Sequence, residues 1–146
     1  MSDPVLLQLS PSTRKSHWRE ERNGLNPFSS LDNDGPNGDL DIDGILNIDE
    51  WIADTRPNDA SSFPRIDDVE KNQDPVTLFF ESSPTRIHHG QSGDDLNPSS
   101  FNTFEAVPGN GRTLSVTDTN NAGTNRFYRL EYKEPWNYFR LLIVDC

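Results

Sequence analysis

Asp39–Glu50 reads D-L-D-I-D-G-I-L-N-I-D-E, and this stretch decides how the chain is organised. It fits the calcium-loop pattern D-x-D/N-x-D/N-G-x₅-E at every position. The aspartates at loop positions 1, 3 and 5 can bring their carboxylates to one ion, and the glycine at position 6 permits the sharp turn that this requires. The candidate ligands are Asp39, Asp41, Asp43, the backbone carbonyl of Ile45, Asn47 directly or through water, and Glu50 with both carboxylate oxygens. Hard oxygen ligands in this number favour Ca²⁺.

The residues after the loop favour a folded site over a solvated acidic turn. Apolar side chains recur there at helical spacing, at Ile45, Ile48, Trp51 and Ile52. The loop therefore leads into a helix that can bury one face. We predict this helix over Ile48–Asp54, ending before Pro57, because proline cannot continue a helix.

Composition leaves little material for a hydrophobic core. The chain has 146 residues, of which 32% are hydrophobic, with 11 prolines and 9 glycines. This suits one domain or two very small ones. The only cysteine is Cys146, so no disulfide within the chain can stabilise the fold. A bound calcium ion can do so, because its binding free energy adds to folding when the site exists only in the folded state.

The negative charge is concentrated around the loop. The formal net charge is -11, and between Asn23 and Thr55 there are eight carboxylates and no lysine, arginine or histidine. Such a block repels itself unless cations are bound. The absence of a basic patch with interleaved aromatics argues against nucleic acid as a partner.

A second ion site is a further candidate. Its oxygen ligands would come from the turn-rich segment before the loop and from the turn after the helix, namely Asp32, Asp34, Asn37 and Asp59. Their spacing fits no complete calcium loop. The alternative interpretation, a solvated loop of Asx-turns, stays open.

We expect an α+β fold in three parts. Residues 1–11 form an arm, and residues 12–63 form a helix–calcium-loop–helix module with a first helix over Thr13–Asn23. Gly35-Pro36-Asn37-Gly38 stands where a regular entering helix would lie. Residues 64–146 contain short β-prone runs between turn residues, which predicts a small antiparallel β-sandwich or barrel. The predicted strands are Val76–Phe80, Thr85–His89, Phe101–Val107, Thr113–Val116, Arg126–Tyr132 and Tyr138–Val144.

Three segments in this order resemble a known family: W-R-E-E-R-N-G-L-N-P at Trp18–Pro27, D-L-D-I-D-G-I-L-N-I-D-E-W at Asp39–Trp51 and T-R-P-N-D-A-S-S at Thr55–Ser62. They are similar to the thrombospondin type 3-like calcium repeat modules near the ends of large secreted or surface bacterial proteins. The resemblance implies a calcium module followed by a small β domain that carries a motif like F-Y-R-L, here Phe127–Leu130. Two departures stand out. Arg56 replaces a usual aspartate, and the insertion 32–38 precedes the loop.

The function that we expect is a calcium-binding, non-catalytic structural module, a C-terminal appendage or spacer of a bacterial secreted or cell-surface protein. One alternative is a dockerin-like interaction module, although a second loop copy is missing. Another is an intracellular EF-hand sensor, although sensors usually pair two complete loops. The β part would contact another protein or a surface glycan.

An enzyme is not expected. His88 and His89 are adjacent and would project to opposite faces of a strand, as surface residues. No glycine-rich phosphate loop or nucleophile elbow occurs. No apolar run reaches transmembrane length, and Met1–Arg22 lacks the apolar core of a signal peptide. The expected location is extracellular or at the cell surface as part of a longer exported protein, or cytoplasmic if the start is genuine.

Overall fold

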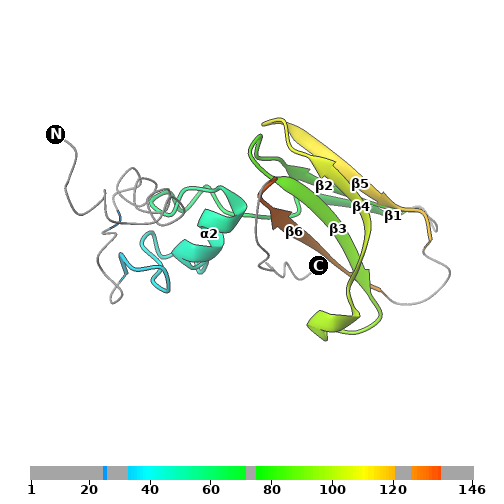
Figure 1. Ribbon diagram of the computed structural model, residues 1–146, viewed down its shortest axis with the longest axis horizontal. Helices are drawn as coiled ribbons and strands as arrows, with labels where there is room; N and C mark the ends of the chain where they lie inside the picture. Colours follow the sequence, from blue (N-terminus) through cyan, green and yellow to red (C-terminus); the bar gives the residue numbers. More distant parts are fainter. Residues whose placement is uncertain (1–24, 26–32, 72–74, 121–125, 136–146) are drawn as a thin grey trace. The chain divides into compact units, whose positions relative to one another are not determined.

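The computed structural model describes residues 25, 33–71, 75–120 and 126–135 (Figure 1). The predicted arm 1–11, the helix over Thr13–Asn23, the strand over Tyr138–Val144 and Asp32 lie outside these residues. The described chain divides into two compact units. The acidic unit comprises residues 25, 33–51 and 56–63, and the β unit comprises the remaining described residues, including 52–55.

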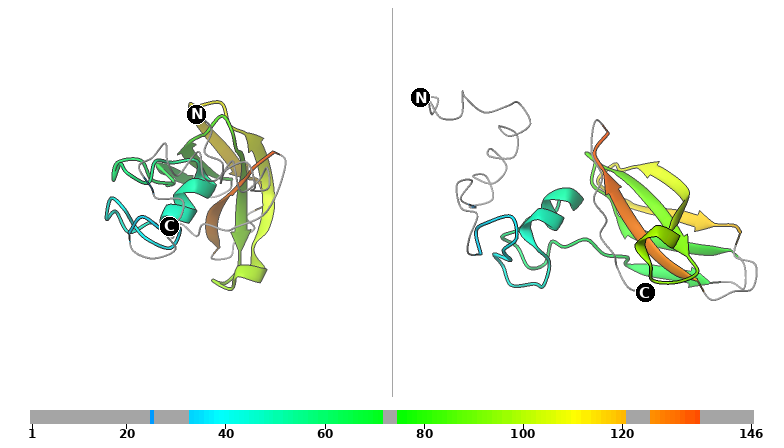
Figure 2. Two further views of the ribbon diagram at one scale, coloured as in Figure 1. Left: turned by 60° about the vertical axis from the view of Figure 1, so that its left-hand side comes forward. Right: turned by 60° about the horizontal axis from the view of Figure 1, so that its bottom comes forward.

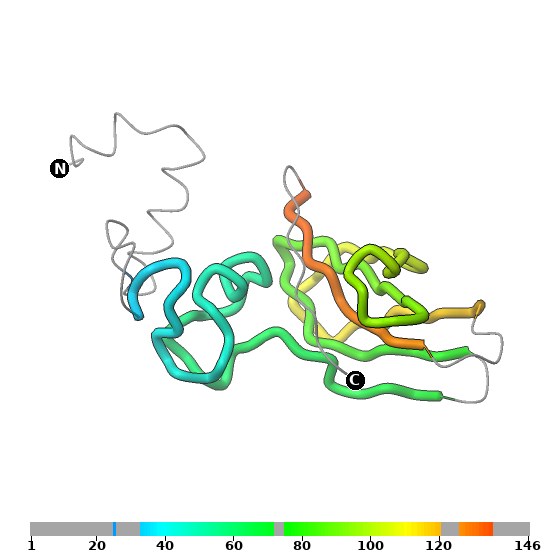
Figure 3. The backbone as a smooth tube through the Cα atoms, turned by 90° about the horizontal axis from the view of Figure 1, so that it is seen from below, coloured from blue at the N-terminus to red at the C-terminus, as the bar shows by residue number. Residues whose placement is uncertain are grey.

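The acidic unit contains the N-terminal part of α2, a helix over Asn47–Ala53. The sequence predicted this helix one residue later. Asp49 and Glu50 lie in its first turn, where negative charge is favourable to the helix dipole. Residues 33–46 before it form turns and bends rather than a helix, as the backbone trace in Figure 3 shows.

Two backbone contacts join this turn segment to the start of α2. The N–H of Asn47 donates to the carbonyl of Gly38 at 2.8 Å, and the N–H of Ile48 donates to the carbonyl of Pro36 at 2.9 Å. The first N–H groups of a helix have no partner within the helix itself. The chain that enters the loop therefore closes the N-terminal end of α2.

The β unit consists of two three-stranded antiparallel sheets (Figure 2). The first has the order β1-β2-β5 and the second the order β4-β3-β6. Their bounds are Asp68–Lys71 for β1, Val76–Glu81 for β2, Ile87–Gly93 for β3, Asn102–Pro108 for β4, Thr113–Asp118 for β5 and Phe127–Lys133 for β6. A 3-10 turn over Pro98–Ser100 precedes β4. The fold is thus mixed α+β with a β-rich part.

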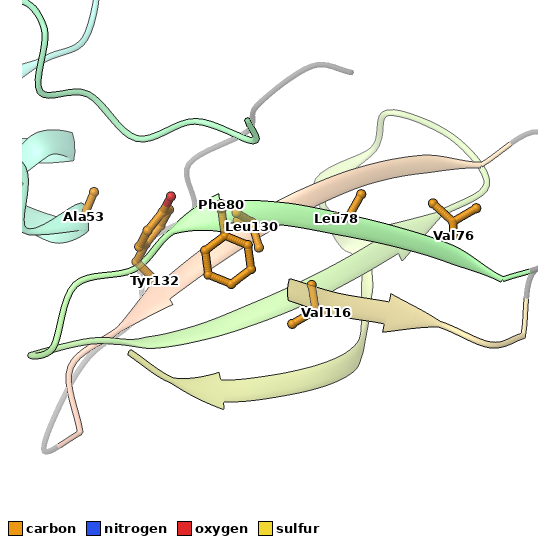
Figure 4. Packing of buried hydrophobic residues seen from close by; sticks show 7 residues of the cluster. All are labelled: Ala53, Val76, Leu78, Phe80, Val116, Leu130 and Tyr132. Carbon is orange, nitrogen blue, oxygen red and sulfur yellow. The ribbon is translucent and has the colours of Figure 1, made fainter. Parts of the chain in front are cut away.

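The hydrophobic core of the β unit takes side chains from both sheets (Figure 4). Alternate residues of β2 are buried, as expected for a strand with one face in a core. The buried cluster consists of Ala53, Val76, Leu78, Phe80, Val116, Leu130 and Tyr132. Ala53 brings the end of α2 into this cluster, which explains why residues 52–55 belong to the β unit.

Gly90 in β3 marks a place where the two sheets approach closely. A Cβ atom at this position would lie 2.6 Å from Phe104 Cζ of β4 and 2.6 Å from Val116 Cγ2 of β5. Such distances are far inside van der Waals contact. An added Cβ atom would therefore force the side chains of Phe104 in the same sheet and Val116 in the other sheet to move.

His88 differs from the sequence prediction. The prediction of a surface residue is wrong, because its side chain is fully buried. Its ring stacks on Phe80 with centroids 5.0 Å apart and meets Tyr132 edge-on at 5.1 Å. The backbone N–H of Ser83 donates to Nε2 at 3.3 Å. Burial lowers the pKa of His88 to about 4, with smaller contributions from Arg86 and His89.

β1 was not predicted from the sequence. All four of its residues are exposed, so it lacks the apolar alternation by which a strand is recognised. Among the described residues, no helix has the length and apolar character needed to cross a membrane.

Candidate metal centre

The backbone of the loop folds sharply between Asp39 and Ile45. Gly44 has a φ of 97° and Ile42 a φ of 62°, both in the left-handed region. One carboxylate oxygen of Asp39 accepts a hydrogen bond from the N–H of Asp43 at 3.2 Å, and the other accepts one from the N–H of Gly44 at 2.9 Å. Oδ1 of Asp43 accepts one from the N–H of Ile45 at 2.8 Å. These bonds turn the chain back on itself.

The turn gathers three of the predicted ligands. Asp39, Asp41 and Asp43 each offer a carboxylate oxygen, and these atoms all lie within 4.8 Å of one another. Both oxygens of Asp41 and Oδ2 of Asp43 are buried and have no hydrogen-bond donor. A buried anionic oxygen without a donor is unfavourable. A cation bound among these atoms would satisfy them.

The electrostatics of Asp41 reflect this crowding. Burial raises the pKa of its carboxyl group, and repulsion from Asp43 and then Asp39 raises it further. The backbone N–H groups of Asp43 and Asp59 have the opposite effect on this pKa, although neither makes a full hydrogen bond to Asp41. The charged form of Asp41 therefore lacks a counter-charge among its protein neighbours.

Asn47 makes side-chain hydrogen bonds that the loop pattern does not describe, and its role as a ligand stays a prediction. Its side chain is buried, and its Oδ1 accepts a hydrogen bond from the N–H of Leu40 at 3.1 Å. Its Nδ2 donates to the carbonyls of Asn33 at 2.6 Å and Gly35 at 2.8 Å. The amide thus ties the loop to the turn segment before it. The sequence pattern contains no signal for these backbone partners.

The two remaining predicted ligands, Ile45 and Glu50, occupy positions 7 and 12 of the loop. Glu50 is fully buried on α2, and Ile45 is half-buried at loop position 7. The group of three carboxylates within 4.8 Å does not include Glu50. Glu50 is thus buried at the end of the loop, where the pattern places the ligand of position 12.

The structure describes three of the four candidate ligands of a second ion, and the two aspartates among them belong to no group of this kind. Asp34 and Asn37 are exposed. One carboxylate oxygen of Asp59 accepts hydrogen bonds from the N–H and hydroxyl of Ser61, and the other pairs with Arg56. Arg56 stands where the similar family has an aspartate, and it pairs with Asp59, the nearest carboxylate that could take the place of that aspartate. A second ion stays a prediction.

The β unit holds a buried polar cluster that the sequence did not reveal. The Arg129 guanidinium stacks on the Phe101 ring at 3.9 Å, and its Nε donates to Gln91 Oε1 at 2.7 Å. Gln91 Nε2 in turn donates to Glu131 Oε2 at 2.8 Å, and Glu131 pairs with Lys133 at 3.0 Å. The chain of contacts links β3 and β6, in which Glu131 is paired with Lys133 and the Arg129 charge is held by the neutral partners Gln91 and Phe101.

In comparisons with protein-family models, curated proteins and solved structures, none matched this chain. The resemblance to thrombospondin type 3-like modules therefore rests on the three segments quoted above.

Proposed function

We propose that the chain is a calcium-binding, non-catalytic structural module. One ion would be held by Asp39, Asp41 and Asp43, the carbonyl of Ile45 and the carboxylate of Glu50. The observation that carries the proposal is the group of three carboxylates within 4.8 Å, with buried oxygens of Asp41 and Asp43 that no donor reaches. Oxygen ligands in a flexible loop suit Ca²⁺ better than Mg²⁺, which demands near-octahedral geometry and dehydrates reluctantly.

A structural ion is favoured over a regulatory one by the segment before the loop. Sensor proteins respond to calcium by changing the angle between two helices. Here turns at residues 33–38 precede the loop, and Asn47 and the first N–H groups of α2 bind them. These contacts leave no entering helix to swing among the described residues. The ion would hold this compact arrangement together.

A structural ion also suits an extracellular location within a longer exported protein. Extracellular modules bind calcium with dissociation constants of about 10⁻⁴–10⁻³ M, and such sites stay filled where calcium is abundant. We further infer that the two sheets pack face to face as a sandwich, since one core cluster takes side chains from both. Contact of the β unit with another protein or a surface glycan remains part of the proposal.

Calcium titration by calorimetry, combined with thermal unfolding, tests the proposal. We expect binding of calcium at the loop, a melting temperature that falls in chelator and recovers with Ca²⁺, and weaker recovery with Mg²⁺. Saturation at 100 times Kd corresponds to about 2.7 kcal/mol of added stability. An identical melting curve with calcium and with chelator would exclude a stabilising ion.

Two variants localise the ion. Glu50→Gln removes a charged ligand and should weaken calcium binding by at least about tenfold. Asp49→Asn is the matched control, because it removes the same charge from the neighbouring residue, which is not in the ligand set. Equal loss in both variants would indicate a diffuse charge effect and contradict the assigned ligands.

A further inference from the structure

Ile42 occupies an unusual backbone conformation within the loop. Its φ is 62°, in the left-handed region that β-branched residues adopt only under constraint. It lies between Asp41 and Asp43, whose carboxylates converge. The conformation of Ile42 is therefore part of the geometry that brings these two candidate ligands together.

Packing of the Ile42 side chain does not hold the residue in this strained conformation. It is 80% exposed, so burial contributes little to holding the residue in place. The constraint comes from its neighbours, since Asp39 accepts hydrogen bonds from the N–H groups of Asp43 and Gly44. Replacement of Ile42 therefore changes the backbone preference at this position and removes few contacts.

We propose that Ile42 sets the calcium affinity of the loop below the value that its ligands alone would give. This inference rests on the proposed calcium site. Two effects oppose the ion-ready conformation, namely the repulsion among three carboxylates and the left-handed backbone at a β-branched residue. Without metal, only a fraction of the molecules has the loop in the conformation that binds the ion. The apparent dissociation constant for calcium equals the intrinsic one divided by this fraction, so it is higher. A weakened loop matches the affinity range of extracellular modules.

The test compares four variants by calcium calorimetry. Ile42→Asn and Ile42→Gly relieve the strain, because asparagine and glycine accept positive φ readily. We expect Ile42→Asn to lower Kd about tenfold, equivalent to about 1.4 kcal/mol, and Ile42→Gly to lower it by a similar or smaller factor. Ile42→Val keeps the branched side chain and should stay within about twofold of the natural protein. Leu46→Asn makes the same polar change at another exposed loop residue, without positive φ, and should also stay within about twofold.

A second measurement reads the loop without calcium. The N–H groups of Asp43 and Gly44 donate to Asp39 in the structure, so their protection from exchange reports this closed arrangement of the loop. Their hydrogen exchange in metal-free protein should slow by about threefold in Ile42→Asn, because this factor and the tenfold change in Kd together correspond to about 2 kcal/mol of relieved strain. It should remain unchanged in Ile42→Val.

The outcomes separate this inference from the proposed function. If the natural protein binds calcium but Ile42→Asn has the same Kd and the same exchange rates, the role of Ile42 is overturned and the calcium site stands. Equal tightening in Ile42→Val or Leu46→Asn would also overturn it, because neither relieves the strain. Absence of calcium binding in the natural protein overturns the proposed function, and the affinity claim falls with it.

Discussion

At the scale of single residues, Asn47 supports the loop through hydrogen bonds of its side-chain amide. The loop pattern assigns it as a ligand. In the fold its amide accepts from Leu40 and donates to Asn33 and Gly35, which leaves only part of Oδ1 for an ion. The residue holds the loop against the turns before it and so places the aspartates indirectly.

Asn47→Ala should therefore destabilise the protein even when no calcium is present. The change leaves one N–H and two carbonyl groups without their partner, and we expect a loss of about 2–4 kcal/mol in the free energy of unfolding. Urea unfolding in calcium-free buffer measures this. Asn37→Ala, an exposed asparagine in the same segment, is the control and should change stability by less than about 0.5 kcal/mol. A variant that lost calcium affinity but kept its metal-free stability would identify Asn47 as a direct ligand instead.

At the scale of elements, the close approach of β3 to the other sheet depends on Gly90. Gly90→Ala would place a methyl group 2.6 Å from Val116 Cγ2 and Phe104 Cζ. We expect a loss of about 1–3 kcal/mol, the usual range for an overpacked core. Thermal or urea unfolding measures it.

A compensating change provides the control for this prediction. Val116→Ala removes one of the two groups that the new Cβ would meet, the other being the Phe104 ring. The double variant Gly90→Ala with Val116→Ala should therefore lose less than the sum of the two single variants. A purely additive double variant would show that the contact between the sheets is not the cause.

The sequence predicted most of the described elements close to their positions. The helix after the loop follows from the helical spacing of its apolar residues, and five strands follow from β-prone runs between turn residues. β3 begins at Ile87 rather than Thr85, since Thr85 and Arg86 instead contact Asp54 and Ile52. These partners lie more than 30 residues away in the chain, and no local pattern encodes them.

The candidate site was predictable to a similar extent and for a similar reason. The gathering of Asp39, Asp41 and Asp43 follows from the loop pattern itself. The roles of Asn47 and Asp59 could not be predicted, because they depend on backbone groups and on Arg56 rather than on residue type at a fixed spacing. The left-handed conformation of Ile42 could not be predicted either, because a β-branched residue favours a negative φ.

At the scale of the whole molecule, stability should depend on pH through His88. Its pKa is about 4 in the fold and about 6.5 in an unfolded chain, so the folded state favours the neutral ring. The contribution of His88 is fully present above pH 6.5. It declines as pH falls from 6.5 to 4, because the unfolded chain binds the proton first. At about 1.4 kcal/mol per pKa unit, the decline amounts to ~3 kcal/mol.

Urea unfolding between pH 7.5 and pH 4 in calcium-free buffer measures this decline. His88→Gln cannot titrate but keeps an acceptor for the N–H of Ser83, so its stability should vary less over this range. The carboxylates of the loop titrate equally in both proteins and cancel in the comparison. Parallel curves for the two proteins would mean that His88 is not the group responsible.

The exposed strand β1 has a consequence for the molecule at high concentration. It forms one edge of its sheet, and an unpaired edge invites pairing with the edge of another chain, which leads to aggregation. Asp68, Glu70 and Lys71 put charged side chains along this edge, and such charges oppose edge-to-edge pairing. Molecules crowded together on one surface would thus remain separate along this edge, so many copies could be displayed side by side without forming fibres through it.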